Sequence, residues 1–560
     1  MNYDVRLEFG VKQEMRDGIK LSSDIYRPDS EERFPTIVTR SPYMTVEGFQ
    51  KRFADEAKFF ASRGYVYVIQ DCRGKNDSEG TYQPFFDDPT DGYDTLEWCA
   101  RQVWSNGSIG TIGASYQAWN QWQAATLSPP NLKAMICIVS LPDPVINVPF
   151  QNGALVLWMA EWMAMVDGKK NTDPSIFDTA KIYNHLPLRS MDGKFGRPNS
   201  AIWQKWIDHP SSDEFWRKTF YQDKFDRIDL PVLHISGWYD DIIGTHLNYI
   251  GMKRHAPSEK ARENQKLIIG PWQHHVNVTR RLSSIDFGES SLIDLRKIEL
   301  DWFDYWLKGI DNGVMNQPMV DIFVMGRNSW KRSDAWPFEG TKYIKYFLHS
   351  SGRANTSAGD GLLSAIEPKD TEGSNSVDTY TYDPKDPCPN LFDDTSGVAA
   401  EAPHDQRPIE RRDDVLVYST PRLDSEVEVS GPVKVKLYAS SSALDTDFWA
   451  QLVDVFPNGY SMHLTEGILR ARYRNSLAKP ELLEPHKVYQ FSIDLWVTSN
   501  AFLKDHRIRL DVSTSSFPKY DRNPNTGHEF GRDAEMQVAE QKIYHTKGFP
   551  SHVVLPIAQS

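Results

Sequence analysis

Short apolar strands alternate with amphipathic helices in the first third of the chain. Residues 36–39 and 65–69 are β-branched, apolar runs, and residues 49–63 between them carry apolar side chains at helical spacing. The alternation continues with a helix over 93–101, a strand over 109–112, a helix over 116–126 and a strand over 134–139. Because consecutive βαβ units have this order, the pattern predicts a mostly parallel, doubly wound sheet.

The alternation is interrupted and then resumes. Residues 143–225 are rich in Trp and Met, with Leu155, Trp158, Met159, Trp162 and Val166 at helical spacing and no convincing strand. Strand-like runs return at 231–235 and 266–269, followed by an amphipathic helix that ends at Gly309. The sequence therefore predicts an all-helical insertion within one α/β domain.

The last part of the chain has a different pattern. Beyond about residue 336, alternating runs such as 433–438 and 508–512 are separated by turn-rich stretches, which predicts an antiparallel sandwich or jelly roll. We therefore expect an α/β domain over 1–142 and 226–335, a helical cap over 143–225, and a jelly roll over 336–560.

Charge and composition exclude several classes of partner. The chain has 63 Lys and Arg against 76 Asp and Glu, a net charge of −13, so no nucleic acid and no membrane partner is expected. The longest apolar run, residues 154–166, is interrupted by Glu161 and is too short to cross a bilayer. A charged amino terminus and four cysteines outside any C-x-x-C pair favour a cytoplasmic protein with buried free thiols.

A serine follows a strand in the setting of a nucleophile elbow. The strand over 109–112 leads into Gly113 and Ala114, and Ser115 then begins a helix. Such a strained turn lifts a serine hydroxyl out of the sheet. The match to G-x-S-x-G is incomplete, because its fifth position is Gln117.

An acid and a base follow later strands in the order that an α/β-hydrolase requires. Asp240 and Asp241 come after the strand over 231–235, and His274 and His275 come after the strand over 266–269. The carboxyl ends of parallel strands meet at one edge of a sheet, so these groups can meet Ser115 there. Neither a zinc motif nor a nucleotide-binding glycine pattern is present, so we expect no metal and no cofactor.

Motifs along nearly the whole chain resemble one family, the serine esterases and acylases of the cocaine esterase type, which are related to X-Pro dipeptidyl-peptidases. The motifs that carry this resemblance are Met15-Arg-Asp-Gly18, Asp24-Ile-Tyr-Arg-Pro28, Ser41-Pro-Tyr43, Gln70-Asp-Cys-Arg-Gly74, Gly113-Ala-Ser-Tyr116, Gly237-Trp-Tyr-Asp240, Gly270-Pro-Trp-Gln-His274, Asp445-Thr-Asp-Phe448, Asp454-Val-Phe-Pro457 and Phe517-Pro-Lys-Tyr-Asp-Arg522. The resemblance implies an α/β-hydrolase fold with a cap and a C-terminal jelly roll.

The resemblance also implies roles for individual residues. Ser115 is expected to be the nucleophile, His274 the general base and acid, and Asp240 the residue that orients the histidine. The Tyr43 hydroxyl and the backbone N–H of Tyr116 are expected to form the oxyanion hole. Asp241 and His275 adjoin the chosen residues and are the alternatives for the acid and the base.

The cap is expected to supply an apolar acyl pocket. The resemblance places Phe150 and Trp162 beside the acyl group, and Trp158 lies one helical turn before Trp162. Relatives that bind a free amino group are expected to carry two acids shortly after the triad aspartate, but these positions read Ile242 and Ile243 here. We therefore expect Ile242 to line the pocket, while Asp143 or Glu161 could supply a carboxylate from the cap.

Three functional hypotheses follow. The first is a serine hydrolase that acts through an acyl-enzyme intermediate. Its substrates are small-molecule esters, or also amides, that carry an apolar or aromatic acyl group. The second is an X-Pro dipeptidyl aminopeptidase or acylase of the same family. The third is a carbohydrate-binding protein that acts through its jelly roll. A homodimer is compatible with all three.

Overall fold

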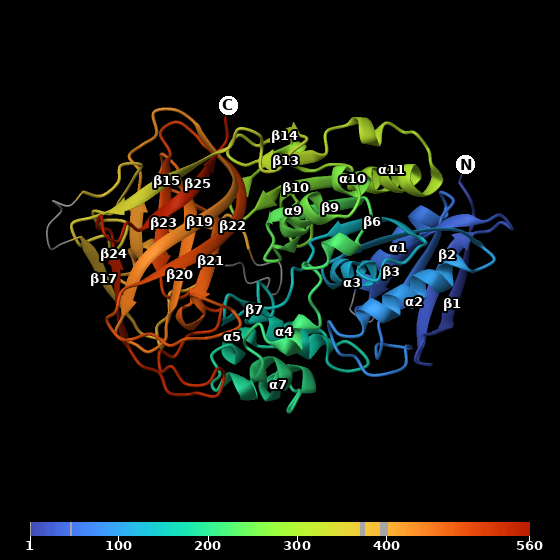
Figure 1. Cartoon of the computed structure of the whole chain (residues 1–560), viewed down its shortest axis with the longest axis horizontal. Helices are drawn as coiled ribbons and strands as arrows, with labels where there is room; N and C mark the ends of the chain where they lie inside the picture. Colours follow the sequence, from blue (N-terminus) through green and yellow to red (C-terminus); the bar gives the residue numbers. More distant parts are fainter. Residues whose placement is uncertain (1, 45–47, 370–375, 392–400, 560) are drawn as a thin grey trace.

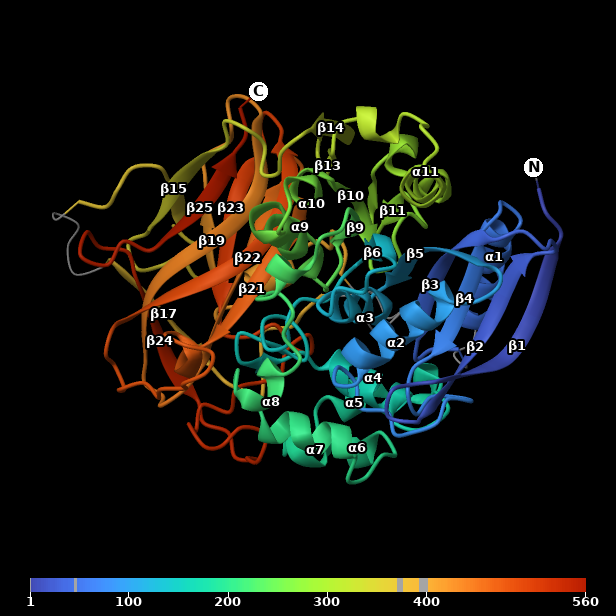
Figure 2. The same ribbon diagram turned by 45° about the vertical axis from the view of Figure 1, so that its right-hand side comes forward.

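The computed structural model describes residues 2–44, 48–369, 376–391 and 401–559. These residues form an α/β half and a half made of strands, which pack side by side (Figures 1 and 2). A group of short helices lies below the junction of the two halves in Figure 1.

The α/β half is built on one ten-stranded sheet, in the order β1-β2-β4-β3-β5-β6-β9-β10-β13-β14. Its strands are β1 (Val5–Glu14), β2 (Lys20–Pro28), β3 (Phe34–Ser41), β4 (Val66–Asp71), β5 (Ser105–Ala114), β6 (Leu132–Ile138), β9 (Val232–Tyr239), β10 (Gln265–Gln273), β13 (Val320–Val324) and β14 (Ser329–Ser333). The pairs from β4 to β13 are parallel, as the sequence predicts. The outer pairs β1–β2, β2–β4 and β13–β14 are antiparallel and were not predicted.

Helices cover both faces of this sheet. α1 (Phe49–Ala61) and α11 (Leu295–Lys308) pack on one face, where Phe60 and Phe303 cluster with Ile37 of β3. α2 (Asp88–Ala100) and α3 (Tyr116–Ala125) pack on the other face, where Trp119 clusters with Val38. Neighbouring residues of β3 thus point to opposite faces, as the strand period requires, and β3 is buried throughout. α9 (Gly244–His255) and the short α10 (Glu259–Glu263) connect β9 to β10.

The insertion between β6 and β9 consists of short helices and one small hairpin. The helices are α4 (Trp158–Val166), η1 (Pro174–Ile176), α5 (Thr179–Ile182), η2 (Leu188–Ser190), α6 (Met191–Lys194), α7 (Ala201–Asp208), α8 (Glu214–Arg217) and η3 (Phe225–Arg227). β7 (Phe150–Gln151) and β8 (Ala154–Leu155) pair with each other before α4 begins. The expectation of an all-helical insertion is therefore wrong in this detail, because the two strands are too short to show a period in the sequence.

The second half of the chain forms an eleven-stranded sheet system. Its strands are β15 (Lys342–His349), β16 (Leu362–Ser364), β17 (Val377–Tyr382), β18 (Leu416–Ser419), β19 (Val427–Ser441), β20 (Asp447–Val455), β21 (Ser461–Arg470), β22 (Tyr489–Phe502), β23 (Arg507–Ser513), β24 (Ala539–Tyr544) and β25 (His552–Ile557). All pairs are antiparallel except β16–β18. The remaining short elements in the described part of the chain are β11 (Arg281–Leu282), β12 (Ile285–Asp286), η4 (Glu289–Ser291), η5 (Val314–Asn316), η7 (Ile409–Arg411) and η8 (Ala471–Tyr473).

Two observations bear on the expectations from composition. The four cysteines Cys72, Cys99, Cys137 and Cys388 are buried free thiols, as predicted. Within the described ranges, every helix is too short or too polar to cross a bilayer.

Candidate active site

Ser115 lies at a strained turn between β5 and α3. Its backbone has φ 61° and ψ −126°, a conformation that non-glycine residues rarely adopt. The turn is tight: a Cβ atom on Gly113 would lie 2.5 Å from the Cβ of Gln117. Glycine is therefore required at position 113, and the Gln117 side chain occupies the space beside it. This geometry raises the Ser115 hydroxyl above the carboxyl edge of the sheet.

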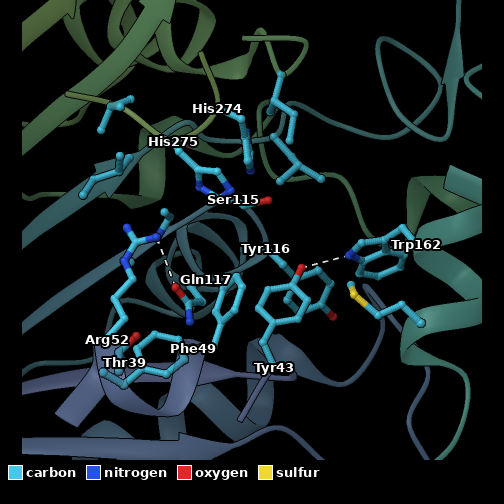
Figure 3. A pocket seen from close by; sticks show the side chains of 18 of the residues that line it. Thr39, Tyr43, Phe49, Arg52, Ser115, Tyr116, Gln117, Trp162, His274 and His275 are labelled. Carbon is cyan, nitrogen blue, oxygen red and sulfur yellow. Dashed lines mark hydrogen bonds between the residues drawn. The ribbon is translucent and has the colours of Figure 1, made fainter. Parts of the chain in front are cut away.

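An imidazole and a carboxylate lie on the neighbouring strand ends. Asp240 directly follows β9, and His274 directly follows β10. The Nδ1 of His274 is 2.9 Å from Oδ1 of Asp240, which also accepts the backbone N–H of Ile242 at 3.0 Å. The Asp240 side chain is fully buried. Figure 3 shows His274 on the side of the cavity that holds Ser115, and both residues line that cavity.

The adjacent residues Asp241 and His275 have different surroundings. Asp241 pairs with Lys519, with its Oδ1 3.0 Å from Nζ, so its carboxylate is engaged by the strand-made half of the chain. His275 lines the cavity, but burial and the neighbouring charges of His274 and Arg52 lower its pKa to about 4. Its ring is therefore neutral at neutral pH. The structure thus brings Asp240 and His274 together as a hydrogen-bonded acid and imidazole.

Tyr43 presents a phenol hydroxyl beside Ser115. It follows β3, and its oxygen accepts a hydrogen bond of 2.9 Å from Nε1 of Trp162 on α4. The Tyr43 hydroxyl also interacts with the Ser115 side chain, and burial raises the pKa of the phenol. Because Trp162 donates to the oxygen, the phenol hydrogen is free to be donated to a third group. Figure 3 shows Tyr43 and Trp162 facing each other on one side of Ser115.

Tyr116 is the first residue of α3, so its backbone N–H has no acceptor within the helix. Two hydrogen bonds fix its ring. The Tyr116 hydroxyl donates one to the Asp88 carboxylate and accepts the other from the backbone N–H of Phe85 at 2.9 Å. Asp88 in turn pairs with Arg40 at 3.1 Å. These contacts hold the first turn of α3 beside the cavity, which Tyr116 also lines.

The cavity has a volume of about 350 Å³ and is mainly apolar. Its lining includes Tyr43, Phe49, Phe53, Phe85, Ser115, Tyr116, Leu141, Trp158, Met159, Trp162, Met165, Ile242, His274, His275 and Val276. The structure thus brings Trp158, Trp162 and Ile242 of the predicted pocket together. It also adds Phe85, whose ring stacks on Trp162 with 6.1 Å between centroids and whose role no sequence pattern revealed.

Phe150 is not among the described residues that line this cavity, which corrects the expectation that it contacts the acyl group. Its side chain is fully buried in β7 and packs edge-on against Phe530, with 5.4 Å between ring centroids. The hairpin that carries Phe150 faces the strand-made half of the chain, so the ring fills an interface between the halves.

Three charged side chains also line the cavity: Arg52, Glu56 and Glu161. Glu161 lies on α4 between the two tryptophans, is buried, and accepts a hydrogen bond of 3.0 Å from the Tyr183 hydroxyl. Burial raises the pKa of Glu161, and the Tyr183 hydrogen bond opposes that rise. Asp143, the alternative carboxylate, instead accepts the backbone N–H groups of Tyr221 and Gln222 and does not line the cavity. The described residues hold no group of three or more His, Cys, Asp or Glu side chains arranged to bind a metal ion.

Two solved structures resemble the whole chain. The first is an aminopeptidase from a marine sediment archaeon, Thaumarchaeota archaeon, with 28% identity, a TM-score of 0.86, and coverage of 100% of this chain and 97% of that one. The second is an α-amino acid ester hydrolase, with 27% identity, a TM-score of 0.86, and coverage of 99% and 97%. Both likenesses extend over the α/β half, the insertion and the strand-made half together.

Sequence comparison identifies the family. Residues 17–276 match the sequence profile of the X-Pro dipeptidyl-peptidase (S15 family), and residues 312–554 match that of the X-Pro dipeptidyl-peptidase C-terminal non-catalytic domain. The chain is 37% identical to the cocaine esterase of Rhodococcus sp. (strain MB1 Bresler), over 99% of both sequences. It has an N-terminal α/β hydrolase domain and a C-terminal domain made of strands. The chain therefore belongs to the X-Pro dipeptidyl-peptidase S15 family of serine hydrolases, together with the esterases of the cocaine esterase type.

Proposed function

We propose that the protein hydrolyses carboxylic esters with apolar or aromatic acyl groups, using Ser115, His274 and Asp240 as a catalytic triad. The observation that carries this proposal is the hydrogen bond of 2.9 Å between His274 and Asp240 at the edge of the cavity that also contains the strained Ser115. The insertion acts as a cap that supplies the apolar cavity wall, and the strand-made domain has the jelly-roll type of fold.

In the acylation step, His274 removes the Ser115 proton as the hydroxyl attacks the acyl carbon. Asp240 holds the imidazole by its Nδ1 and stabilises the imidazolium that forms. The tetrahedral intermediate then collapses, its C–O bond to the leaving alcohol breaks, and His274 returns the proton to that oxygen. The acyl group is left on Ser115.

The negative oxygen of the intermediate is stabilised by the Tyr43 hydroxyl and the backbone N–H of Tyr116. Because burial raises the pKa of Tyr43, the phenol keeps its hydrogen over the working pH range and can donate it. A donor in such a position contributes about 2.7–4 kcal/mol of transition-state stabilisation. Water then attacks the acyl-enzyme with His274 as base, and the same donors act again.

Covalent labelling tests the proposed nucleophile. We expect a fluorophosphonate to phosphonylate Ser115 alone, with loss of fluoride and complete loss of esterase activity. Peptide mass mapping locates the adduct. An unlabelled enzyme, or an adduct on a different residue that accounts for the inhibition, would contradict the proposal.

A second candidate function is hydrolysis of α-aminoacyl esters or of peptides with a free amino terminus. Glu161 favours it, because its carboxylate lines the cavity between Trp158 and Trp162 and accepts a hydrogen bond from the neutral Tyr183 hydroxyl. A carboxylate in an apolar, aromatic wall can bind a substrate ammonium group by charge pairing and cation–π contact with the rings. The solved relatives named as an aminopeptidase and an α-amino acid ester hydrolase support the same reading.

The two functions are separated by one ratio of specificity constants. We expect Glu161→Gln to lower kcat/KM for phenylalanine p-nitrophenyl ester relative to the 3-phenylpropanoate ester by about 10-fold, as loss of a hydrogen bond to a charged group predicts. The 3-phenylpropanoate ester, which lacks the amino group, is the matched control. An unchanged ratio, together with slow cleavage of Ala-Pro-p-nitroanilide, would exclude the aminoacyl function and leave the esterase assignment in place.

A further inference from the structure

Lys519 of the strand-made domain lies among three carboxylates at the junction with the α/β domain. Its Nζ is 3.0 Å from Oδ1 of Asp241, 2.5 Å from Oε1 of Glu401 and 2.7 Å from Oε1 of Glu466. The lysine side chain is only 11% exposed. His463 adds a fourth titratable group, with its Nε2 3.3 Å from Glu401. β21, which carries Glu466, contacts β9 of the α/β domain.

Asp241 connects this cluster to the loop that carries Asp240. The two aspartates are adjacent, one bonded to His274 and the other to Lys519. The preceding residue, Tyr239, donates its hydroxyl to the backbone oxygen of His463 at 3.1 Å. The strand-made domain therefore holds the loop on both sides of Asp240.

Glu401 connects the same cluster to the loop that carries His274. The side-chain amide of Gln273, which immediately precedes His274, donates to the backbone oxygen of Glu401 at 2.8 Å. The Glu401 carboxylate is at the same time 2.5 Å from Lys519. Lys519 is thus linked to the Asp240 loop through Asp241 and to the His274 loop through Glu401.

The balance of charge makes Lys519 important for this arrangement. Burial raises the pKa of Asp241, and the Glu401 carboxylate adds to that rise while Lys519 opposes it. Without the ammonium group, Asp241, Glu401 and Glu466 would be buried acids with no lysine between them. Such groups repel one another and are costly to bury, so the loops would move apart.

We propose that Lys519 is a positioning residue of the hydrolytic site, which holds the Asp240 and His274 loops together through Asp241 and Glu401. The proposal rests on hydrolysis at Ser115 as described above. It gives a role in catalysis to a domain whose sequence profile is described as non-catalytic. Lys519 does not touch the reacting atoms and acts through its neighbours.

Lys519→Met tests the proposal, with active sites counted by fluorophosphonate titration so that unfolded protein does not contribute. We expect kcat per titrated site to fall by about 100-fold with little change in KM, because a displacement of about 1 Å in a catalytic group has an effect of this size. The other charged groups that face His274, namely Asp240, His275 and, through His275, Arg52, are unchanged in this variant.

Further variants separate positioning from stability. Lys519→Arg keeps the charge and is expected to keep most of kcat per titrated site. Glu466→Gln removes one of the carboxylates that pair with Lys519, so we expect it to lower kcat per titrated site, though less than Lys519→Met does. Asp378→Asn is the matched control, because Asp378 is a fully buried acid of the same domain, on β17, which lies far from β9 in Figure 1. We expect it to lower the melting temperature without altering kcat per titrated site.

Two outcomes would overturn the proposal. One is an unchanged kcat per titrated site in Lys519→Met, or in Glu466→Gln if Lys519→Met does not fold. The other is a similar loss of kcat per titrated site in Asp378→Asn. If the wild-type enzyme were not labelled at Ser115, the proposed function itself would fail, and this result is distinguishable from both.

Discussion

Ser115→Ala is expected to lower kcat/KM for a p-nitrophenyl ester of an apolar acid by at least about 10⁴-fold. The substitution removes the only atom that forms the acyl-enzyme in the proposed reaction, while the cavity and the oxyanion donors remain. Steady-state kinetics with purified protein, corrected for the uncatalysed rate, measure the effect. Circular dichroism and thermal melting confirm that the variant is folded.

Ser128→Ala is the matched control for this variant. Ser128 follows α3, is exposed, and like Ser115 has a positive φ, at 52°. The substitution of a hydrogen for a hydroxyl is therefore made at a second residue with positive φ that does not line the cavity. We expect full activity in Ser128→Ala. If Ser115→Ala kept more than one hundredth of the wild-type activity, the assignment of Ser115 as nucleophile would be contradicted.

Tyr43→Phe is expected to lower kcat by about 10²- to 10³-fold with a much smaller change in KM, because the hydroxyl contributes most when the oxyanion has formed. The aromatic ring and its packing are kept. Trp162→Phe keeps Tyr43 but removes the Nε1 donor that orients its hydroxyl, so we expect a decrease in kcat in the same direction and smaller. Kinetics on a series of acyl chain lengths separate this effect from a change in pocket size.

Tyr249→Phe provides the control for loss of a buried phenol. Tyr249 is buried on α9 and does not line the cavity. We expect kcat to be unaffected in this variant. A similar loss of kcat in Tyr249→Phe, or a Tyr43→Phe enzyme whose KM rises while kcat is kept, would show that Tyr43 binds substrate without stabilising the oxyanion.

The elbow and the sheet around it could be predicted from the sequence because their signals are local. The predicted helix over 116–126 coincides with α3 to within one residue, and the predicted strand over 109–112 lies within β5. A buried parallel strand, a close-packed glycine and a following helix each leave a mark over a few residues. The edge strand β1 was missed because most of its residues are partly or fully exposed, so no continuous apolar run marks it.

The choice between adjacent residues could not be made from local sequence patterns and came from the family resemblance. Asp240 and Asp241 both follow β9, yet one meets His274 and the other meets Lys519, 278 positions further along the chain. Side-chain direction at a strand end depends on the local backbone and on distant partners, and a sequence pattern shows neither. The same reason explains why Lys519 had no visible role beyond the motif that contains it.

The pocket residues were only partly predictable. Phe150, Trp158 and Trp162 all belong to apolar segments of the insertion, but only the two tryptophans line the cavity. Apolar side chains against a cavity and apolar side chains in an interface have the same periodicity and the same burial. Glu161 was more informative about the position of the cavity than these apolar residues, because an acid in a Trp- and Met-rich helix needs a specific partner.

The contacts between the insertion and residues 519–521 have a consequence for synthesis of the protein. The backbone N–H of Leu157 donates a hydrogen bond to the backbone oxygen of Lys519. The backbone N–H of Leu155 donates to the side-chain carboxylate of Asp521, which lies 366 positions further along the chain. At about 5–20 residues per second, a ribosome needs roughly 20 to 70 seconds to join these partners. During that interval the apolar segment before α4 lacks its binding partner, so the nascent chain leaves apolar side chains open to aggregation.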